Sequence, residues 1–258
     1  MTVDIPAELS RTTAALRRAG CVAAEDEAVE LVEAAAGDPA RLQELVGRRC
    51  RGEPLAWLVG SVRFCGEKVL VHLGVYVPRW QTEPLALEAA ERLPDTGIAV
   101  DLCTGSGAIA VVLQCRRSFA HVVATENHPL AIACARANGV EVFEGDMAAN
   151  VPAALSGVVD VVTAVVPYVP TDELRLLPRD VTAYEPRGAL DGGTDGTTFL
   201  VRAATEAVPL LRTGGSLLLE LGGAEAEMLE PVLIGLSYRD LELLSDDDDD
   251  VRALVCRR

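Results

Sequence analysis

A loop with two glycines lies between an apolar stretch and a helical pattern, in the segment Asp101-Leu102-Cys103-Thr104-Gly105-Ser106-Gly107. Glycine lets the backbone turn tightly and approach a ligand closely. Glu126 ends the next apolar stretch, about 20 residues further on, where an acid can bind both hydroxyls of a ribose. The residues predicted to bind a nucleoside-containing cofactor here are Asp101, Thr104, Gly105, Gly107 and Glu126.

The cofactor predicted from these residues is S-adenosylmethionine (SAM) and not a dinucleotide. The loop continues into Ile109-Ala110 and lacks the third glycine of the pyrophosphate-binding pattern. The acid before the loop, Asp101, suits a ligand that carries sulfonium and ammonium charges. Asp146 and Met147 follow a third short strand, so we expect the carboxylate to bind the adenine amino group and the thioether to pack on the ring.

A sheet must position these residues, because apolar runs alternate with helical patterns from residue 81 to the C-terminus. The longer runs are 98–102, 120–124, 158–166, 215–221, 241–244 and 251–255, and the helical patterns are 83–92, from 108 onward, 129–138 and 197–211. With the short strand before residue 144 they predict an α/β fold, in which a mostly parallel sheet of seven strands has helices on both faces. In such a sheet the ligand lies at the carboxyl ends of the strands.

The N-terminal part reads differently. Residues 1–50 predict a small helical domain, whose third helix starts at Asp38-Pro39, a capping acid followed by proline at the first helical position. Residues 51–80 predict a linker with a β-hairpin around Gly66. The cofactor-binding domain is therefore predicted to span residues 81–258.

Four segments make the sequence similar to the HemK/PrmC family of protein-glutamine methyltransferases. They are Gly-Glu-Pro-Leu-Ala at 52–56, Val-Pro-Arg-Trp-Gln-Thr-Glu at 77–83, the 101–107 loop, and Glu-Pro-Arg-Gly-Ala-Leu-Asp-Gly-Gly at 185–193. The resemblance implies a SAM-dependent methyltransferase with a class I, Rossmann-like fold and a helical N-terminal domain. It also implies an acceptor, the side-chain amide of a glutamine in peptide-chain release factors.

The sequence departs from that family beside the expected acceptor. The family has Asn-Pro-Pro-Tyr where this chain has Val165-Val166-Pro167-Tyr168, and it usually has Pro-Glu at the position of Trp80 and its neighbour. In the family the Asn side chain and the following backbone carbonyl accept hydrogen bonds from the acceptor amide, and valine cannot replace the first of these. Trp80 and residues 165–168 are therefore predicted to form an apolar and aromatic acceptor pocket.

These departures favour a small aromatic acceptor, such as an indole or phenol of specialised metabolism, methylated at carbon, nitrogen or oxygen. Pro167 would help to position it, and Tyr168 and Glu185 are candidate partners for a nucleophile that loses a proton. Two alternatives remain open. One is glutamine methylation of a release factor, and the other is a SAM-binding interaction protein without catalytic activity.

The composition disfavours some classes of binding partner, but it does not indicate the oligomeric state. The net charge of −16 disfavours nucleic acid, because phosphate binding needs clustered Lys and Arg. Neither a signal-peptide pattern nor the roughly 20 apolar residues of a membrane span is found, so we expect a cytoplasmic protein. The three histidines and seven cysteines lack metal-ligand spacing, and no metal is expected.

Overall fold

The computed structural model describes residues 5–258, except the side chain of Arg179, so the first four residues of the predicted N-terminal domain lie outside it. Its first four helices are α1 (Ile5–Arg18), α2 (Ala24–Ala34), α3 (Pro39–Cys50) and α4 (Leu55–Val59). Asp38 caps α3 as expected, since its carboxylate accepts from the backbone N–H of Ala40 at 2.9 Å. Leucines from all four helices share one core, so the helical unit extends to Val59.

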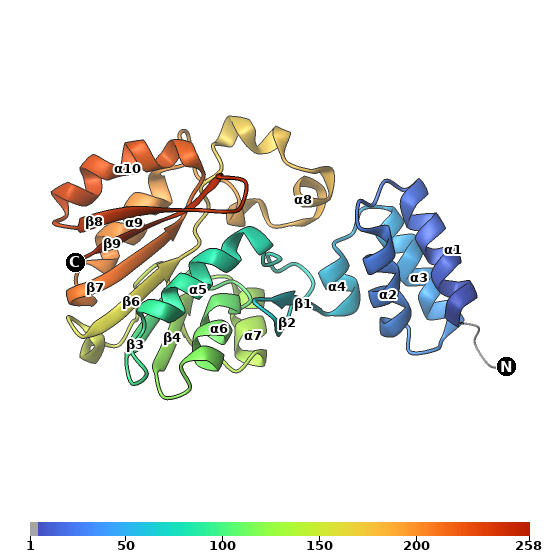
Figure 1. Cartoon of the computed structure of the whole chain (residues 1–258), viewed down its shortest axis with the longest axis horizontal. Coiled ribbons are helices and arrows are strands. Elements are labelled where there is room, and N and C mark those ends of the chain that lie inside the picture. The colour runs from blue at the N-terminus through green and yellow to red at the C-terminus, as the bar shows by residue number, and fades with distance from the viewer. Residues whose placement is uncertain (1–4) are drawn as a thin grey trace.

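A short hairpin follows the helical unit. Strands β1 (Ser61–Phe64) and β2 (Glu67–Leu70) pair antiparallel. Helix α4 is bonded to the segment that follows the hairpin, since the indole N–H of Trp57 donates to the Val75 carbonyl at 2.9 Å. Figure 1 shows the helical unit at one end of the molecule, joined through this segment to the larger domain. The division at residues 50 and 80 stays an interpretation of the sequence, and α4 lies within the part that was expected to be a linker.

The larger domain is built on a sheet of seven strands in the order β5-β4-β3-β6-β7-β9-β8. Their bounds are β3 (Ile98–Leu102), β4 (His121–Glu126), β5 (Glu141–Glu144), β6 (Val159–Ala164), β7 (Leu211–Glu220), β8 (Arg239–Ser245) and β9 (Val251–Arg257). The first five strands in that order are parallel, and β9 runs antiparallel to both β7 and β8. The predicted mostly parallel sheet is confirmed.

Helices cover both faces of the sheet, as predicted, and bury a hydrophobic core against each face. One face carries α5 (Glu83–Arg92), α6 (Ala108–Arg116) and α7 (Pro129–Ala137), and the other carries α9 (Thr198–Ala207) and α10 (Gly223–Gly235). The apolar strands are nearly continuous because both of their faces are buried. None of the helices in residues 5–258 is long and apolar enough to cross a membrane.

The segment between β6 and α9 crosses the carboxyl end of the sheet. It contains short 3-10 helices at Thr171–Leu176 and Arg187–Ala189, with α8 (Arg179–Tyr184) between them. The ring of Tyr184 lies edge-on to that of Trp57 with centroids 6.4 Å apart, and its hydroxyl donates to the Arg51 carbonyl at 3.2 Å. These contacts link the segment to the helical unit beside it (Figure 1).

Candidate active site

The glycine loop joins β3 to α6, and each of its two glycines has a positive φ, +59° at Gly105 and +86° at Gly107. A Cβ on Gly107 would lie 2.9 Å from a methyl carbon of Val140, so close packing against the α7 region excludes any side chain there. A Cβ on Gly105 would meet nothing within 4 Å, which leaves open space beside the backbone. At Gly105 the loop therefore presents main chain toward the cavity.

Asp101 lies beneath this loop, only 1% exposed, and it does not line the cavity. Its carboxylate accepts from the hydroxyls of Thr104 at 2.5 Å and Thr163 at 2.7 Å. Burial raises the pKa of Asp101 to about 6, and the two threonine hydrogen bonds act against that shift. In this structure Asp101 holds the loop in place, and a direct contact with the cofactor stays a prediction.

Glu126 ends β4 at the cavity wall. One carboxylate oxygen accepts from the Gly105 N–H at 2.9 Å, and the other accepts from the N–H groups of Asn127 at 2.8 Å and His128 at 2.9 Å. Three backbone donors thus fix the carboxylate at the point where a ribose would lie across the strand ends. Because only 9% of Glu126 is exposed, few side-chain positions are available to it.

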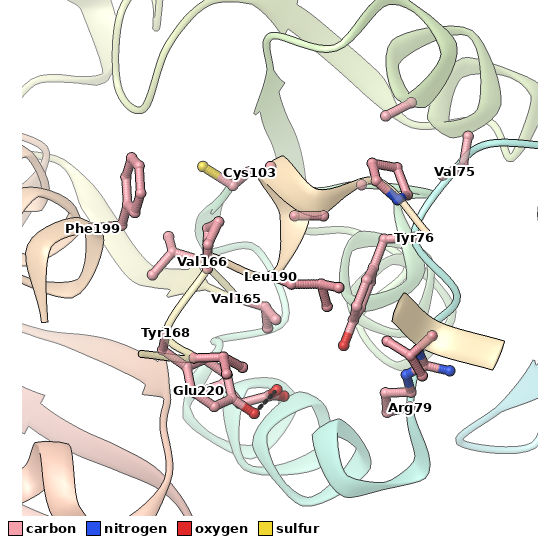
Figure 2. A pocket seen from close by; sticks show the side chains of 18 of the residues that line it. Val75, Tyr76, Arg79, Cys103, Val165, Val166, Tyr168, Leu190, Phe199 and Glu220 are labelled. Atoms are coloured by element: carbon pink, nitrogen blue, oxygen red, sulfur yellow. Dashed lines mark hydrogen bonds between the residues drawn. The ribbon is translucent and has the colours of Figure 1, made fainter. Parts of the chain in front are cut away.

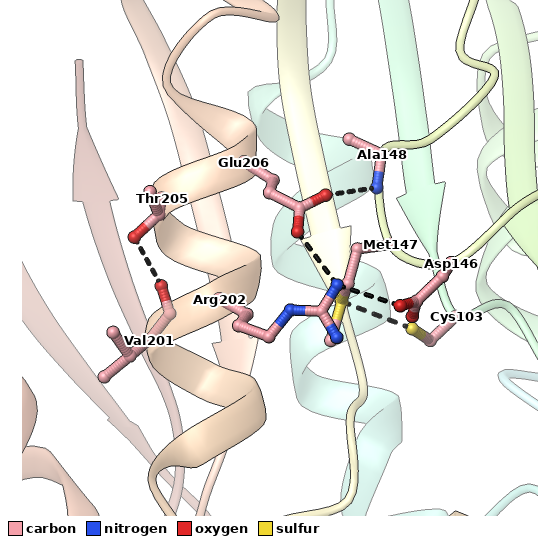
Figure 3. Close-up of polar contacts among 8 residues, drawn as sticks. All are labelled: Cys103, Asp146, Met147, Ala148, Val201, Arg202, Thr205 and Glu206. Carbon is pink, nitrogen blue, oxygen red and sulfur yellow. Dashed lines mark hydrogen bonds and ion pairs between the residues drawn. The ribbon is translucent and has the colours of Figure 1, made fainter.

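Asp146 and Met147 follow β5 as expected, but Asp146 is not a free acid (Figure 3). Arg202 of α9 bonds one oxygen of Asp146 at 3.0 Å and is itself bonded to Glu206 at 3.0 Å. Met147 is 2% exposed, and its sulfur lies 3.6 Å from that of Cys103. The thioether therefore forms an apolar floor, with the exposed carboxylate of Asp146 held at its edge.

A single cavity of about 1080 Å³ connects these groups to the end of β6. Nine of the predicted site residues line it: Trp80, Gly105, Glu126, Asp146, Met147, Val165, Val166, Pro167 and Tyr168. Four predicted residues do not: Asp101, Thr104, Gly107 and Glu185. The volume is large enough for a nucleoside cofactor together with one acceptor side chain.

The acceptor end of the cavity is more polar than expected (Figure 2). The Tyr168 hydroxyl donates to Glu220 of β7 at 3.1 Å, and burial strongly raises the pKa of the Tyr168 phenol. The guanidinium of Arg79 lies 5.1 Å from the centre of the Tyr76 ring. Tyr76, Arg79 and Glu220 line this end together with the two valines of the 165–168 segment.

Glu185 is engaged away from the cavity. It forms an ion pair with Arg79, its other oxygen accepts from the Val77 N–H at 3.3 Å, and its side chain is 1% exposed. This geometry fits a carboxylate that orients Arg79 better than it fits a proton acceptor for substrate. Trp80 lies at the cavity rim, 58% exposed, with the Arg252 guanidinium 5.7 Å from the centre of its ring.

Sequence reasoning did not identify several lining residues, which are Tyr76, Arg79, Cys103, Phe199 and Glu220. One of them could have been found: Glu220 lies within the predicted strand 215–221, near the carboxyl end, where ligands of such sheets bind. Tyr76 and Arg79 come from the linker after the hairpin, and no pattern in the sequence indicates which way that linker folds. Phe199 lies in the first turn of α9 and reaches the cavity only through the packing of that helix.

The arrangement fits SAM. Glu126 can accept from ribose hydroxyls, and Met147, Phe199 and Cys103 supply an apolar slot for a purine ring. The open space at Gly105 leaves room for the cofactor against the loop backbone. The carboxylates on this side also suit a ligand with positive charge.

No family model matches the chain. Among curated proteins, those from Geobacter sulfurreducens (39% identical over 71% of this chain), Moorella thermoacetica (36% over 84%) and Salmonella typhimurium (34% over 80%) are all named release factor glutamine methyltransferase. The matched segment covers 66% of the Geobacter protein, just under two thirds, and 78% of the Moorella protein.

Solved structures with the same fold include a methyltransferase from Pyrococcus furiosus, with a TM-score of 0.52 at 20% identity, covering 74% of this chain and 89% of that one. Another is the 16S rRNA N2 G1207 methyltransferase of Thermus thermophilus in complex with SAM and guanosine, with a TM-score of 0.50 at 17% identity, covering 77% of this chain and 44% of that one.

These comparisons confirm the predicted methyltransferase class and the predicted cofactor, SAM. They also overturn the preferred acceptor: the hypothesis of a small aromatic substrate in specialised metabolism is wrong, because the relatives carry the name of glutamine methyltransferases that act on release factors. The error lay in judging the pocket from Val165 and Trp80 alone, since the acceptor end also receives polar groups from the linker and from β7. The chain belongs to the release factor glutamine methyltransferase family.

Proposed function

We propose that this protein methylates the side-chain amide nitrogen of a glutamine in a peptide-chain release factor. The observation that carries the proposal is the Moorella relative, which is 36% identical over 84% of this chain and has that activity in its name. The cavity gives independent support, because it joins a nucleoside-sized slot to a partly polar recess.

The cofactor half of the cavity has a defined task for each residue. Glu126 would hold the ribose, and Met147 with Phe199 would enclose the adenine between apolar surfaces. Asp146, kept in place by Arg202, would bind at the adenine edge. When bound there, SAM supplies an electrophilic methyl group on a sulfonium. Methyl transfer of this kind depends on in-line positioning, so the chain contributes chiefly by orienting the two partners.

The acceptor half is formed where two segments of the family pattern meet. The Val169 N–H donates to the Leu190 carbonyl at 3.1 Å, and the Gly192 N–H donates to the Val169 carbonyl at 2.8 Å. A Cβ on Gly192 would lie 2.7 Å from the Tyr168 backbone, so only glycine permits this approach. The 185–193 segment therefore fixes the chain after β6, including backbone carbonyls that can accept from an amide whatever side chains they carry.

The test is methylation of a purified, unmethylated bacterial release factor with isotope-labelled SAM, with the product mapped by mass spectrometry. We expect label on one glutamine, and none on a release factor whose acceptor glutamine is replaced by asparagine, which is one methylene shorter. A Glu126→Ala enzyme is the matched protein control. Failure of the wild-type protein to label glutamine would contradict the proposal, and intact SAM binding in that case would favour the catalytically inactive alternative.

The proposed acceptor also fixes the partner and the compartment. A release factor acts in translation, so we propose a cytoplasmic protein that meets its substrate as a folded protein. The net charge of −16 favours recognition of a basic surface on that partner and disfavours direct binding to ribosomal RNA.

A further inference from the structure

Glu220 and Val165 lie side by side at the carboxyl edge of the sheet. Strands β6 and β7 are parallel neighbours in which Ala164 pairs with Leu219. One residue further along each chain, Val165 and Glu220 therefore reach the same edge, and both line the cavity. Figure 2 shows Glu220 bonded to Tyr168 within the recess that also contains Val165.

The two oxygens of the Glu220 carboxylate differ in their hydrogen bonding. Oε1 accepts from the Tyr168 hydroxyl at 3.1 Å, whereas Oε2 is buried and has no hydrogen-bond partner in the part of the chain that the structure describes. The residue is only 3% exposed. Buried polar atoms are almost always paired, so an unpaired oxygen on a residue that lines a ligand cavity indicates a donor that arrives with the ligand.

Burial raises the pKa of Glu220, and the nearby Thr82 and Tyr168 hydroxyls and the charges of Arg252 and Arg79 act against that rise. Arg79 is already paired with Glu185, so it does not neutralise Glu220 by direct contact. In its ionised form Glu220 accepts hydrogen bonds and donates none.

We propose that Glu220 Oε2 accepts a hydrogen bond from the N–H of the acceptor amide, and so replaces the side-chain acceptor that Val165 lacks. This inference rests on the proposed function and names the residue that binds its acceptor. The second acceptor is a backbone carbonyl after β6, which no substitution removes. In its ionised form Glu220 selects an amide and rejects a glutamate side chain, whose carboxylate would be repelled.

The test compares Glu220→Gln with Glu225→Gln. Glu225 is a matched control, because it is also buried and also has an unpaired Oε2, but it does not line the cavity. With a purified release factor as substrate, Glu220→Gln should lower kcat/KM by about 10- to 100-fold, since the one remaining side-chain oxygen is used by the Tyr168 hydroxyl and the NH2 group that replaces Oε2 cannot accept from the acceptor N–H. The dissociation constant of S-adenosylhomocysteine, measured by calorimetry, should stay within about twofold of wild type, and Glu225→Gln should leave both quantities nearly unchanged.

Adding Val165→Asn supplies a second readout that a merely structural role of Glu220 would not move. In the Glu220→Gln background it should restore kcat/KM by at least about fivefold, because the new amide oxygen lies on the neighbouring strand end. In the wild-type background it should raise kcat/KM by less than about threefold, because an acceptor is already present. Measurement of kcat/KM for Val165→Asn in the wild-type background therefore tests the inference even if Glu220→Gln does not fold.

Two results would overturn the inference alone: Glu220→Gln that methylates the release factor as well as wild type, or Val165→Asn that by itself accelerates wild type about tenfold or more. A wild-type protein that methylates no glutamine would overturn the proposed function and this inference with it. Loss of S-adenosylhomocysteine binding in a folded Glu220→Gln protein would also count against the inference, since it would place the carboxylate in the cofactor site.

Discussion

Replacing Glu126 with alanine should weaken cofactor binding about 100-fold. The carboxylate is held by three backbone N–H groups at 2.8 to 2.9 Å, so it is already oriented before the ribose arrives. A hydrogen bond to a charged group contributes about 1.5 to 3 kcal/mol, and two ribose hydroxyls would bind here. Water can enter the open cavity of the variant and replace part of each lost hydrogen bond. We therefore use the lower value of about 1.5 kcal/mol for each ribose hydroxyl, which gives a loss of about 3 kcal/mol of binding free energy. That corresponds to about two factors of ten in the dissociation constant.

The assay is calorimetric titration of S-adenosylhomocysteine into each protein. The matched control is Glu144→Ala, which removes an acid from the end of the neighbouring strand β5, where it is exposed and does not line the cavity. The control should bind within about twofold of wild type, and thermal melting of both variants checks that they fold. An increase of less than about threefold for Glu126→Ala in a folded protein would refute the role assigned to this carboxylate.

Three further predictions concern residues around the two halves of the cavity. Because burial raises the pKa of Asp101 to about 6, its contribution to stability is complete below the unfolded pKa of about 4 and is lost as the pH rises through about 6. Urea denaturation measures the free energy of unfolding of Asp101→Asn relative to that of wild type. This difference should shift in favour of the variant by up to about 3 kcal/mol as the pH rises from about 4 to about 7.5, and a difference that does not change with pH would contradict the prediction. Trp80→Ala should lower kcat/KM for the release factor about tenfold with unchanged affinity for S-adenosylhomocysteine, because an exposed rim tryptophan suits a protein partner; equal losses of both would place the ring on the cofactor. Glu185→Gln should keep activity within about threefold while lowering the free energy of unfolding by about 2 kcal/mol, since it loses the ion pair with Arg79; a loss of about 100-fold would restore Glu185 as a catalytic base.

Much of the fold could be predicted because local signals agree with the global packing. The helix Glu83–Arg92 and the strand Ile98–Leu102 have the predicted bounds, and Asp38 caps its helix as its sequence neighbours indicate. Helix α10 was not predicted, because Pro231 lies inside it and glycines stand at its start and end. Its helical state depends on packing against β8, β9 and α9, which the sequence alone does not display.

The cofactor half of the site was easier to predict than the acceptor half for a geometric reason. Glu126 ends one strand of the parallel sheet, and residues 146–147 come shortly after the next. Because ligands bind at the carboxyl ends of the strands in such sheets, these residues are expected to lie together without knowledge of any long-range contact. Tyr76 and Arg79 reach the cavity from a linker that has no regular structure. Arg202 reaches Asp146 from α9, through a contact between residues 56 positions apart.

The misjudged acceptor shows why one position of a motif is a weak guide to the chemistry of a pocket. A side chain at the end of β6 has a neighbour at the end of β7 in register with it, and Glu220 occupies that place with an unpaired oxygen. Hydrogen-bond recognition depends on where an acceptor atom lies and not on which strand carries it. A valine at 165 therefore removes a polar group from the motif without making the recess apolar, and the joint effect of substitutions at 165 and 220 is the quantity that decides whether an amide can bind.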